Sequence, residues 1–181
     1  MKKGQISFAE YLVALVVFIS FAAYFSFQLL NFLPNYLTQV RSERVRSEGY
    51  QMSEILINDP GSPINWDRVP ADQINRAGLN DETKNLTNYI SAAKILQLKN
   101  LCNNGNDGYS NIKRWLGSDL DFSILITVYN SNTGAPEIFC PPEVSCSCKP
   151  PSYSIRTINA TIKRFATVDS NHFAEIILQV V

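Results

Sequence analysis

The chain has 181 residues, which gives room for a membrane segment and one globular domain but not for two large domains. Lysine plus arginine and aspartate plus glutamate both total 16, so the chain lacks the basic excess that nucleic-acid partners require. Residues 11–33 carry no charge, whereas charges are scattered through the remainder. The sequence therefore predicts an apolar N-terminal rod followed by a water-soluble body.

The apolar segment is long enough to cross a bilayer once. As an α-helix, residues 11–30 would span roughly 30 Å, about the thickness of the hydrocarbon core. A secretory signal has a shorter apolar region that ends in small residues, but here Tyr24, Phe25 and Phe27 continue the run beyond Ala22-Ala23. These features favour a retained anchor over a removed signal peptide.

Glu10 is the residue that a plain anchor does not explain. A carboxylate at the edge of an apolar helix can lie at headgroup level, where the positive helix N-terminus favours it. Alternatively, it can pair with a cation from another copy of the protein, which would offset the cost of burying it. The residues alone leave both interpretations open.

The stretch KKGQISFAEYLVAL resembles the N-terminus of archaeal type IV pilin-like proteins. The resemblance implies that a prepilin peptidase cuts between Gly4 and Gln5 on the cytoplasmic side and leaves the apolar helix in place. The α-amino group of Gln5 could then meet Glu10 of a neighbouring subunit in a filament. The family has this acid at the fifth mature position, which is Ala9 here, and the shift of one residue turns the side chain about 100° around the helix.

Residues 34–57 form the next segment. Pro34 is expected to kink or end the first helix, because it removes a backbone donor and clashes with the preceding turn. Apolar residues at spacings near three and four then predict a second helix or a bent continuation to about Ile57, with a weak point at Gly49. The alternative is a charged linker.

The body, residues 58–181, is expected to begin with loops and short helices. NDPGSPINWD is dense in turn residues, and its Trp66 is expected to pack on the core. Capping acids and apolar spacing predict a helix over 86–101, followed by a turn at NNGNDGYS and a short helix over 109–116. NNGNDG lacks the alternating acids of a calcium loop, so turn chemistry is favoured.

The end of the chain is rich in β-branched and aromatic residues. Four segments are expected to form an antiparallel meander: FSILITVYN, PEIFC, SYSIRTINATIKRFATV and HFAEIILQVV. The predicted fold class is therefore α+β, with a long N-terminal helix and an antiparallel sheet in the head. The run from DPGSPINWD to YSNIKRWLGSDLDFSILI also resembles the heads of exported archaeal pilin-like proteins.

Cysteines and sequons indicate an exported body. Lysine and arginine counts on the two sides of the apolar segment leave the orientation open. An even number of cysteines favours disulfides, and the candidate N-glycosylation sites suit an exported body. Together they place the body outside and the N-terminus in the cytoplasm. The cysteines are Cys102, Cys140, Cys146 and Cys148, and the sequons begin at Asn85 and Asn159.

The cysteine pairing stays open among three possibilities. A bond between Cys146 and Cys148 would be strained, which favours joining one of them to Cys140 and the other to Cys102. A zinc site that uses three cysteines with either Cys102 or His172 is the less favoured alternative, because the spacing lacks a usual zinc pair. His172 otherwise reads as a solvated residue of a turn.

No cofactor, metal or enzymatic activity is expected. The sequence has neither a nucleophile elbow nor a glycine-rich phosphate loop. The leading hypothesis is a pilin-like structural subunit with a leader at 1–4 and a membrane and filament-core helix at 5–33. Its expected partners are a prepilin peptidase, the membrane and other copies or pilin-like subunits. The alternative is a single-pass anchored extracellular binding module that does not polymerise.

Overall fold

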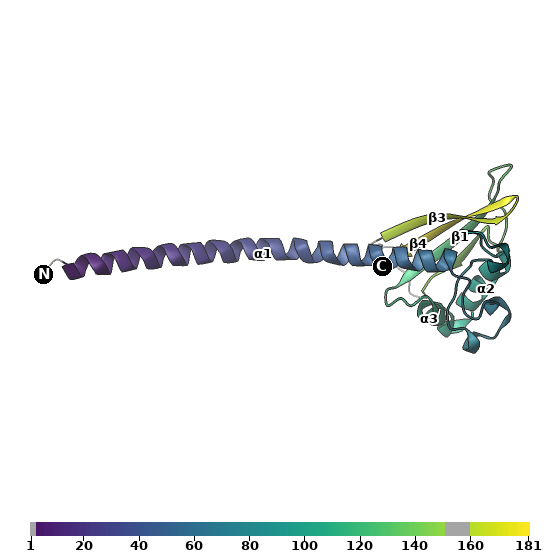
Figure 1. Cartoon of the computed structure of the whole chain (residues 1–181), viewed down its shortest axis with the longest axis horizontal. Coiled ribbons are helices and arrows are strands. Elements are labelled where there is room, and N and C mark those ends of the chain that lie inside the picture. The colour runs from purple at the N-terminus through teal and green to yellow at the C-terminus, as the bar shows by residue number, and fades with distance from the viewer. Residues whose placement is uncertain (1–2, 151–159) are drawn as a thin grey trace. The chain divides into compact units, whose positions relative to one another are not determined.

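The computed structural model describes residues 3–150 and 160–181 (Figure 1). Helix α1 runs over Lys3–Asn58. The chain divides into two compact units, Met1–Ser42 and Glu43–Val181. The second unit, called the head below, contains the last four turns of α1 and all the later elements. The helical extension expected at 34–57 is therefore shared between the two units.

Pro34 lies inside α1, so the first helix does not end there; of the two expected outcomes, the structure has the continuation of the helix to about Ile57 and not a second helix. One proline removes one backbone donor, whereas the residues on both sides continue the helical hydrogen bonding. Gly49, the expected weak point, is also helical and is buried. A methyl group on Gly49 would lie 2.6 Å from Ile162 Cδ1 and 2.9 Å from Val180 Cγ2, so glycine here lets α1 approach the sheet closely.

Short helices follow α1 in the head. The start of the helix expected over 86–101 is wrong, because α2 begins only at Ala92. Asn88 has a positive φ of 57°, and its carbonyl accepts from Thr167 N–H at 2.8 Å, while Ile90 N–H donates back to Thr167 at 2.8 Å. The bounds are η1 Trp66–Arg68, η2 Ala71–Gln73, η3 Glu82–Lys84, α2 Ala92–Cys102 and α3 Gly105–Trp115.

The glycine-rich turn expected at NNGNDGYS is largely helical. Helix α3 starts at Gly105, earlier than the predicted start at residue 109. Gly108 lies against the backbone carbonyls of Leu101 and Cys102, at a distance that leaves no room for a Cβ atom. Glycine is therefore used here for close packing of α3 on the end of α2 rather than for a turn.

The sheet of the head has four antiparallel strands, β1 Phe122–Asn130, β2 Ser145–Cys148, β3 Ala160–Asp169 and β4 His172–Val180 (Figure 1). Their order is β2-β1-β4-β3. The predicted α+β class, with a long N-terminal helix and an antiparallel sheet, is confirmed.

Two details of the expected sheet are wrong. The strand expected at PEIFC forms only isolated bridges, and β2 pairs with β1 instead, with Ile126 opposite Cys146. The strands also do not form a simple meander, because β1 pairs with β4, from Phe122 opposite Val180 to Asn130 opposite His172. The first part of the predicted third strand, residues 152–159, lies outside the described residues.

One face of the sheet builds the core. Ile124, Ile126, Ile176 and Leu178 are each about 1% exposed and lie opposite one another across β1 and β4. The last turns of α1 contribute Val45, Met52, Leu56 and Ile57 to the same apolar cluster. Burial of such side chains stabilises the head by about 1.5–3 kcal/mol each. The C-terminal end of α1 is therefore part of the same hydrophobic core as the sheet.

Trp66 packs in the core as predicted. Its side chain is fully buried, and its Nε1 donates a hydrogen bond of 2.7 Å to the carbonyl of Gly78. Lys94 is also buried, which the sequence did not indicate. Its Nζ donates to the carbonyls of Pro60 at 2.7 Å and Asn80 at 2.8 Å, and burial lowers its pKa. Both residues therefore hold loops of the head in place.

Candidate membrane-spanning and assembly segment

The first unit is a helix whose large apolar side chains are exposed. Phe18, Leu30 and Phe32 are 69%, 72% and 74% exposed, and this exposure extends from Phe8 to Val40. Among the described residues, α1 is the one helix long and apolar enough to cross a membrane. The core helix of a soluble protein would bury such residues, but none of the most apolar window is buried here.

The predicted processing site lies at the start of α1. Gly4 and Gln5 are both within the helical residues, but the side chain of Gln5 lies outside what the structure describes. Glu10 is exposed on the second turn of α1. Among the described residues, Glu10 has no ion-pair partner, and its pairing with the α-amino group of a neighbour stays a prediction.

Polar side chains within the apolar helix partly satisfy one another. Ser26 Oγ donates to the Ala22 carbonyl at 2.8 Å, one turn back along the helix. Gln28 Nε2 donates to the Tyr24 hydroxyl at 2.9 Å. Such local bonds lower the cost of placing a hydroxyl or amide in hydrocarbon. They make these residues compatible with a membrane-spanning helix.

All four cysteines are bonded in two disulfides. Cys102 pairs with Cys148 across 5.6 Å between Cα atoms, and Cys140 pairs with Cys146 across 5.3 Å. This pairing is one of those that the sequence favoured. The first bond joins the last residue of α2 to β2, and the second closes the loop before β2. No thiol remains as a zinc ligand, so the alternative zinc site loses its cysteines.

The two sequons differ in what the structure says of them. Asn159 lies outside the described residues. Asn85 is exposed, has a φ of 51° and follows η3. It borders an open polar groove, to which Asn58 of α1 and Arg164 of β3 also contribute. An exposed amide beside open space is accessible for modification.

The groove beside Asn85 is held by one arginine. Arg164 pairs with Glu54 through Nη2, donates from Nε to Ser53 Oγ at 3.3 Å, and lies 4.5 Å from the centre of the Tyr50 ring. Asn58 Nδ2 also donates to Glu54 at 2.6 Å. These contacts of the guanidinium fix the end of α1 to β3, and the groove is lined mainly by side-chain amides together with the exposed carboxylate of Glu82.

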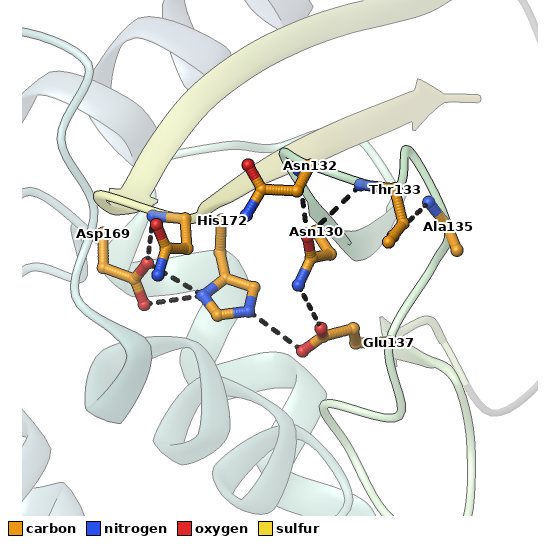
Figure 2. Close-up of polar contacts among 8 residues, drawn as sticks. Asn130, Asn132, Thr133, Ala135, Glu137, Asp169 and His172 are labelled. Carbon is orange, nitrogen blue, oxygen red and sulfur yellow. Dashed lines mark hydrogen bonds and ion pairs between the residues drawn. The ribbon is translucent and has the colours of Figure 1, made fainter.

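His172 is not the simply solvated residue that the sequence suggested (Figure 2). Its Nδ1 lies 2.8 Å from both carboxylate oxygens of Asp169, and its Nε2 lies 3.0 Å from Glu137 Oε2. Asn130 Nδ2 donates to the other oxygen of Glu137 at 2.9 Å. The hydrogen bond with Asp169 is the largest cause that raises the pKa of His172. This His172 bridge ties the β3–β4 turn to the segment after β1.

The bridge does not have the geometry of a metal site. Each ring nitrogen faces a different carboxylate, so Asp169 and Glu137 lie on opposite edges of the imidazole and cannot converge on one ion with it. Asp169, three residues before His172, is visible in the sequence. Glu137 comes from a distant segment, and no sequence pattern places it there.

Comparisons with protein-family models, curated proteins and solved structures find no match to this chain.

Proposed function

We propose that the chain is a pilin-like structural subunit of an archaeal type IV pilus-related system. The supporting observation is the exposed apolar stretch of α1, which follows the proposed MKKG leader and continues into a disulfide-bonded α+β head. An exposed apolar surface of this extent needs lipid or other protein around it. In the proposal, α1 spans the membrane before assembly and packs against copies of itself afterwards.

In this proposal, a prepilin peptidase cuts between Gly4 and Gln5, and the head lies outside the cell. The disulfides of the head suit an oxidising compartment. Glu10 would meet the new α-amino group of a neighbouring subunit, because a carboxylate in an apolar filament core needs a cation.

The cut is tested by the intact mass of protein purified from its native membranes. The expected mass corresponds to a chain that begins at Gln5. A chain that still begins at Met1 or Lys2 would refute the processing step. Immunolabelling of purified surface filaments then tests polymerisation, and filaments without this chain would leave only a membrane-anchored protein.

The role of Glu10 is tested by Glu10→Gln, with Glu43→Gln as the matched control. Both changes remove one carboxylate, but Glu43 lies beyond the charge-free run. Filament yield should fall for Glu10→Gln alone. Equal yields from both variants and the unchanged protein would refute the pairing role.

The second candidate is an anchored extracellular binding module that does not polymerise. The observation in its favour is the polar groove beside Asn85, where side-chain amides from α1, the loop after η3 and the loop before it line an open surface. Absence of the chain from filaments, together with a retained anchor, would favour this candidate.

A further inference from the structure

The His172 bridge joins two loops at one end of the sheet (Figure 2). Asp169 is the last residue of β3 and His172 is the first residue of β4, so both belong to the β3–β4 turn. Glu137 lies in the segment that follows β1, residues 131–137, which we call the 131–137 loop. The imidazole therefore lies between carboxylates from two different connections of the sheet.

The 131–137 loop is folded by bonds that do not involve the imidazole. The Gly134 N–H donates to the carbonyl of Asn130 at 2.8 Å, within the loop and the end of β1. A second kind of bond crosses the junction between the loops, where the Ser131 N–H donates to the carbonyl of Asn171 at 2.6 Å. The loop can thus keep its own conformation while the junction with the β3–β4 turn opens or closes.

The junction is open to solvent. Residues 131–136 are all exposed. In the head, α1 lies against Ile162 of β3 at Gly49 and against Arg164 at Glu54, so the helix runs along β3 toward the β3–β4 turn. The junction is therefore at the end of the sheet away from the point where α1 enters the head, and the pH of the medium acts on it directly.

A neutral imidazole cannot satisfy both carboxylates. It has one N–H donor and one acceptor nitrogen, whereas the protonated ring has two donors. Asp169 also accepts from the Asn171 N–H at 2.8 Å, which is the largest cause that lowers the pKa of this carboxyl. Since both oxygens of Asp169 lie 2.8 Å from Nδ1, the proton of the neutral ring stays on Nδ1. Nε2 then turns a lone pair toward Glu137 Oε2 at 3.0 Å, which is repulsive.

We propose that the His172 bridge is a pH-sensitive switch: protonated His172 holds the 131–137 loop against the β3–β4 turn, and loss of the proton releases Glu137 and opens the junction. The hydrogen bond with Asp169 is the largest cause that raises the pKa of His172 above its ordinary value of 6.5. The closed junction should therefore be complete below pH 6.5 and be lost as the pH rises through the folded-state pKa. The inference goes beyond the proposed function and does not depend on it, because it concerns the head alone.

The other charged side chains of the neighbouring elements are engaged elsewhere. Glu175 is three residues from His172 along β4, so it lies on the opposite face of the sheet, where it pairs with Lys163 of β3. The lysines of α2 donate to backbone carbonyls. Asp169 and Glu137 are the charged groups that raise the pKa of His172, and burial lowers it. The protonation of the imidazole thus depends on the two carboxylates that it joins.

The first test is amide hydrogen exchange of the full-length chain in detergent micelles, resolved by NMR from about pH 5 to pH 9. After correction for the intrinsic rise of exchange with pH, the protection of the Ser131 N–H should fall by about twofold to fivefold. The fall should have the same midpoint as the titration of the His172 ring. The Gly134 N–H, which is bonded within the loop, is the control and should keep its protection. Constant protection of Ser131, or a midpoint different from that of His172, would overturn the proposal.

The second test, Glu137→Gln, distinguishes a proton switch from a fixed contact. The new amide can donate to neutral Nε2 and accept from protonated Nε2, so the Ser131 N–H should stay protected at both ends of the pH range. Glu143→Gln is the matched control, because it removes an exposed carboxylate from the same connection between β1 and β2, outside the His172 bridge. This control should keep the pH dependence of the parent protein.

Either of two results from Glu137→Gln would overturn the proposal. One is a pH dependence equal to that of the parent protein, and the other is loss of Ser131 protection at both ends of the range. Fluorescence of the two buried tryptophans of the head checks that each variant is folded. The presence or absence of the chain in filaments, which tests the proposed function, has no bearing on these results.

Discussion

The two disulfides of the head are expected to stabilise it to different extents. Cys102 and Cys148 are separated by 46 residues and join α2 to the edge strand β2, whereas Cys140 and Cys146 are separated by 6 residues within one loop. All four side chains are buried to 5% exposure or less, so alanine substitution causes similar local losses at each pair. The main difference is the length of the loop that each bond closes in the unfolded chain.

Loop length sets the expected magnitudes. In the chain-entropy model, a crosslink that closes a separation of 46 residues stabilises the folded state by about 4 kcal/mol, and one of 6 residues by about 2 kcal/mol. The double variant Cys102→Ala/Cys148→Ala should therefore lose about 2 kcal/mol more of its free energy of unfolding than Cys140→Ala/Cys146→Ala.

Urea unfolding of the full-length chain in detergent micelles measures this difference. Trp66 and Trp115 are both buried in the head, so their fluorescence follows its unfolding without a contribution from the apolar helix. The parent protein with both disulfides intact and the fully reduced parent protein give the upper and lower limits of the free energy of unfolding. Equal losses in the two double variants, or a larger loss from the shorter loop, would refute the reasoning from loop entropy.

Three further predictions concern single residues of the head. Trp66→Phe removes the hydrogen bond to Gly78 and leaves its buried carbonyl unpaired. The urea midpoint should therefore fall by the equivalent of about 1–3 kcal/mol, and an unchanged midpoint would contradict a stabilising role of this hydrogen bond. Gly78→Ala places a methyl group against the backbone carbonyl of Asp59 and should destabilise the head by about 1–3 kcal/mol or more in the same assay. An unchanged free energy of unfolding would contradict this prediction, because it would mean that the backbone shifts to make room for the methyl group. Because Asp169 raises the pKa of His172, the His172 bridge should be complete below pH 6.5 and be lost as pH rises through the folded-state pKa; an NMR titration midpoint at or below 6.5 would contradict this.

Local sequence signals were sufficient where local chemistry decides the structure. The apolar run of α1, the β-branched strands β1 and β4, and the buried Trp66 all follow from composition and spacing. They failed where a segment bonds to a distant one. The residues before Ala92 look helical, but the backbone of Asn88 and Ile90 pairs with Thr167 instead, which delays the start of α2.

Glycines and prolines were the least informative positions. Pro34 and Gly49 suggested an interruption of α1, and Gly108 suggested a turn, yet all three are helical. Gly49 and Gly108 are needed because another part of the head comes too close for a side chain. Whether a glycine marks a turn or a close contact depends on what lies opposite, which a single sequence does not reveal.

The sequence by itself determined that this protein has a long apolar helix, an α+β body and four cysteines without a usual zinc spacing, because length, periodicity and composition act locally. Tertiary structure alone decided that β2 forms within the cysteine loop, that Cys148 rather than Cys146 pairs with Cys102, and that Glu137 meets His172. Each of these depends on how distant segments of the head pack around one core, which is a property of the folded chain as a whole.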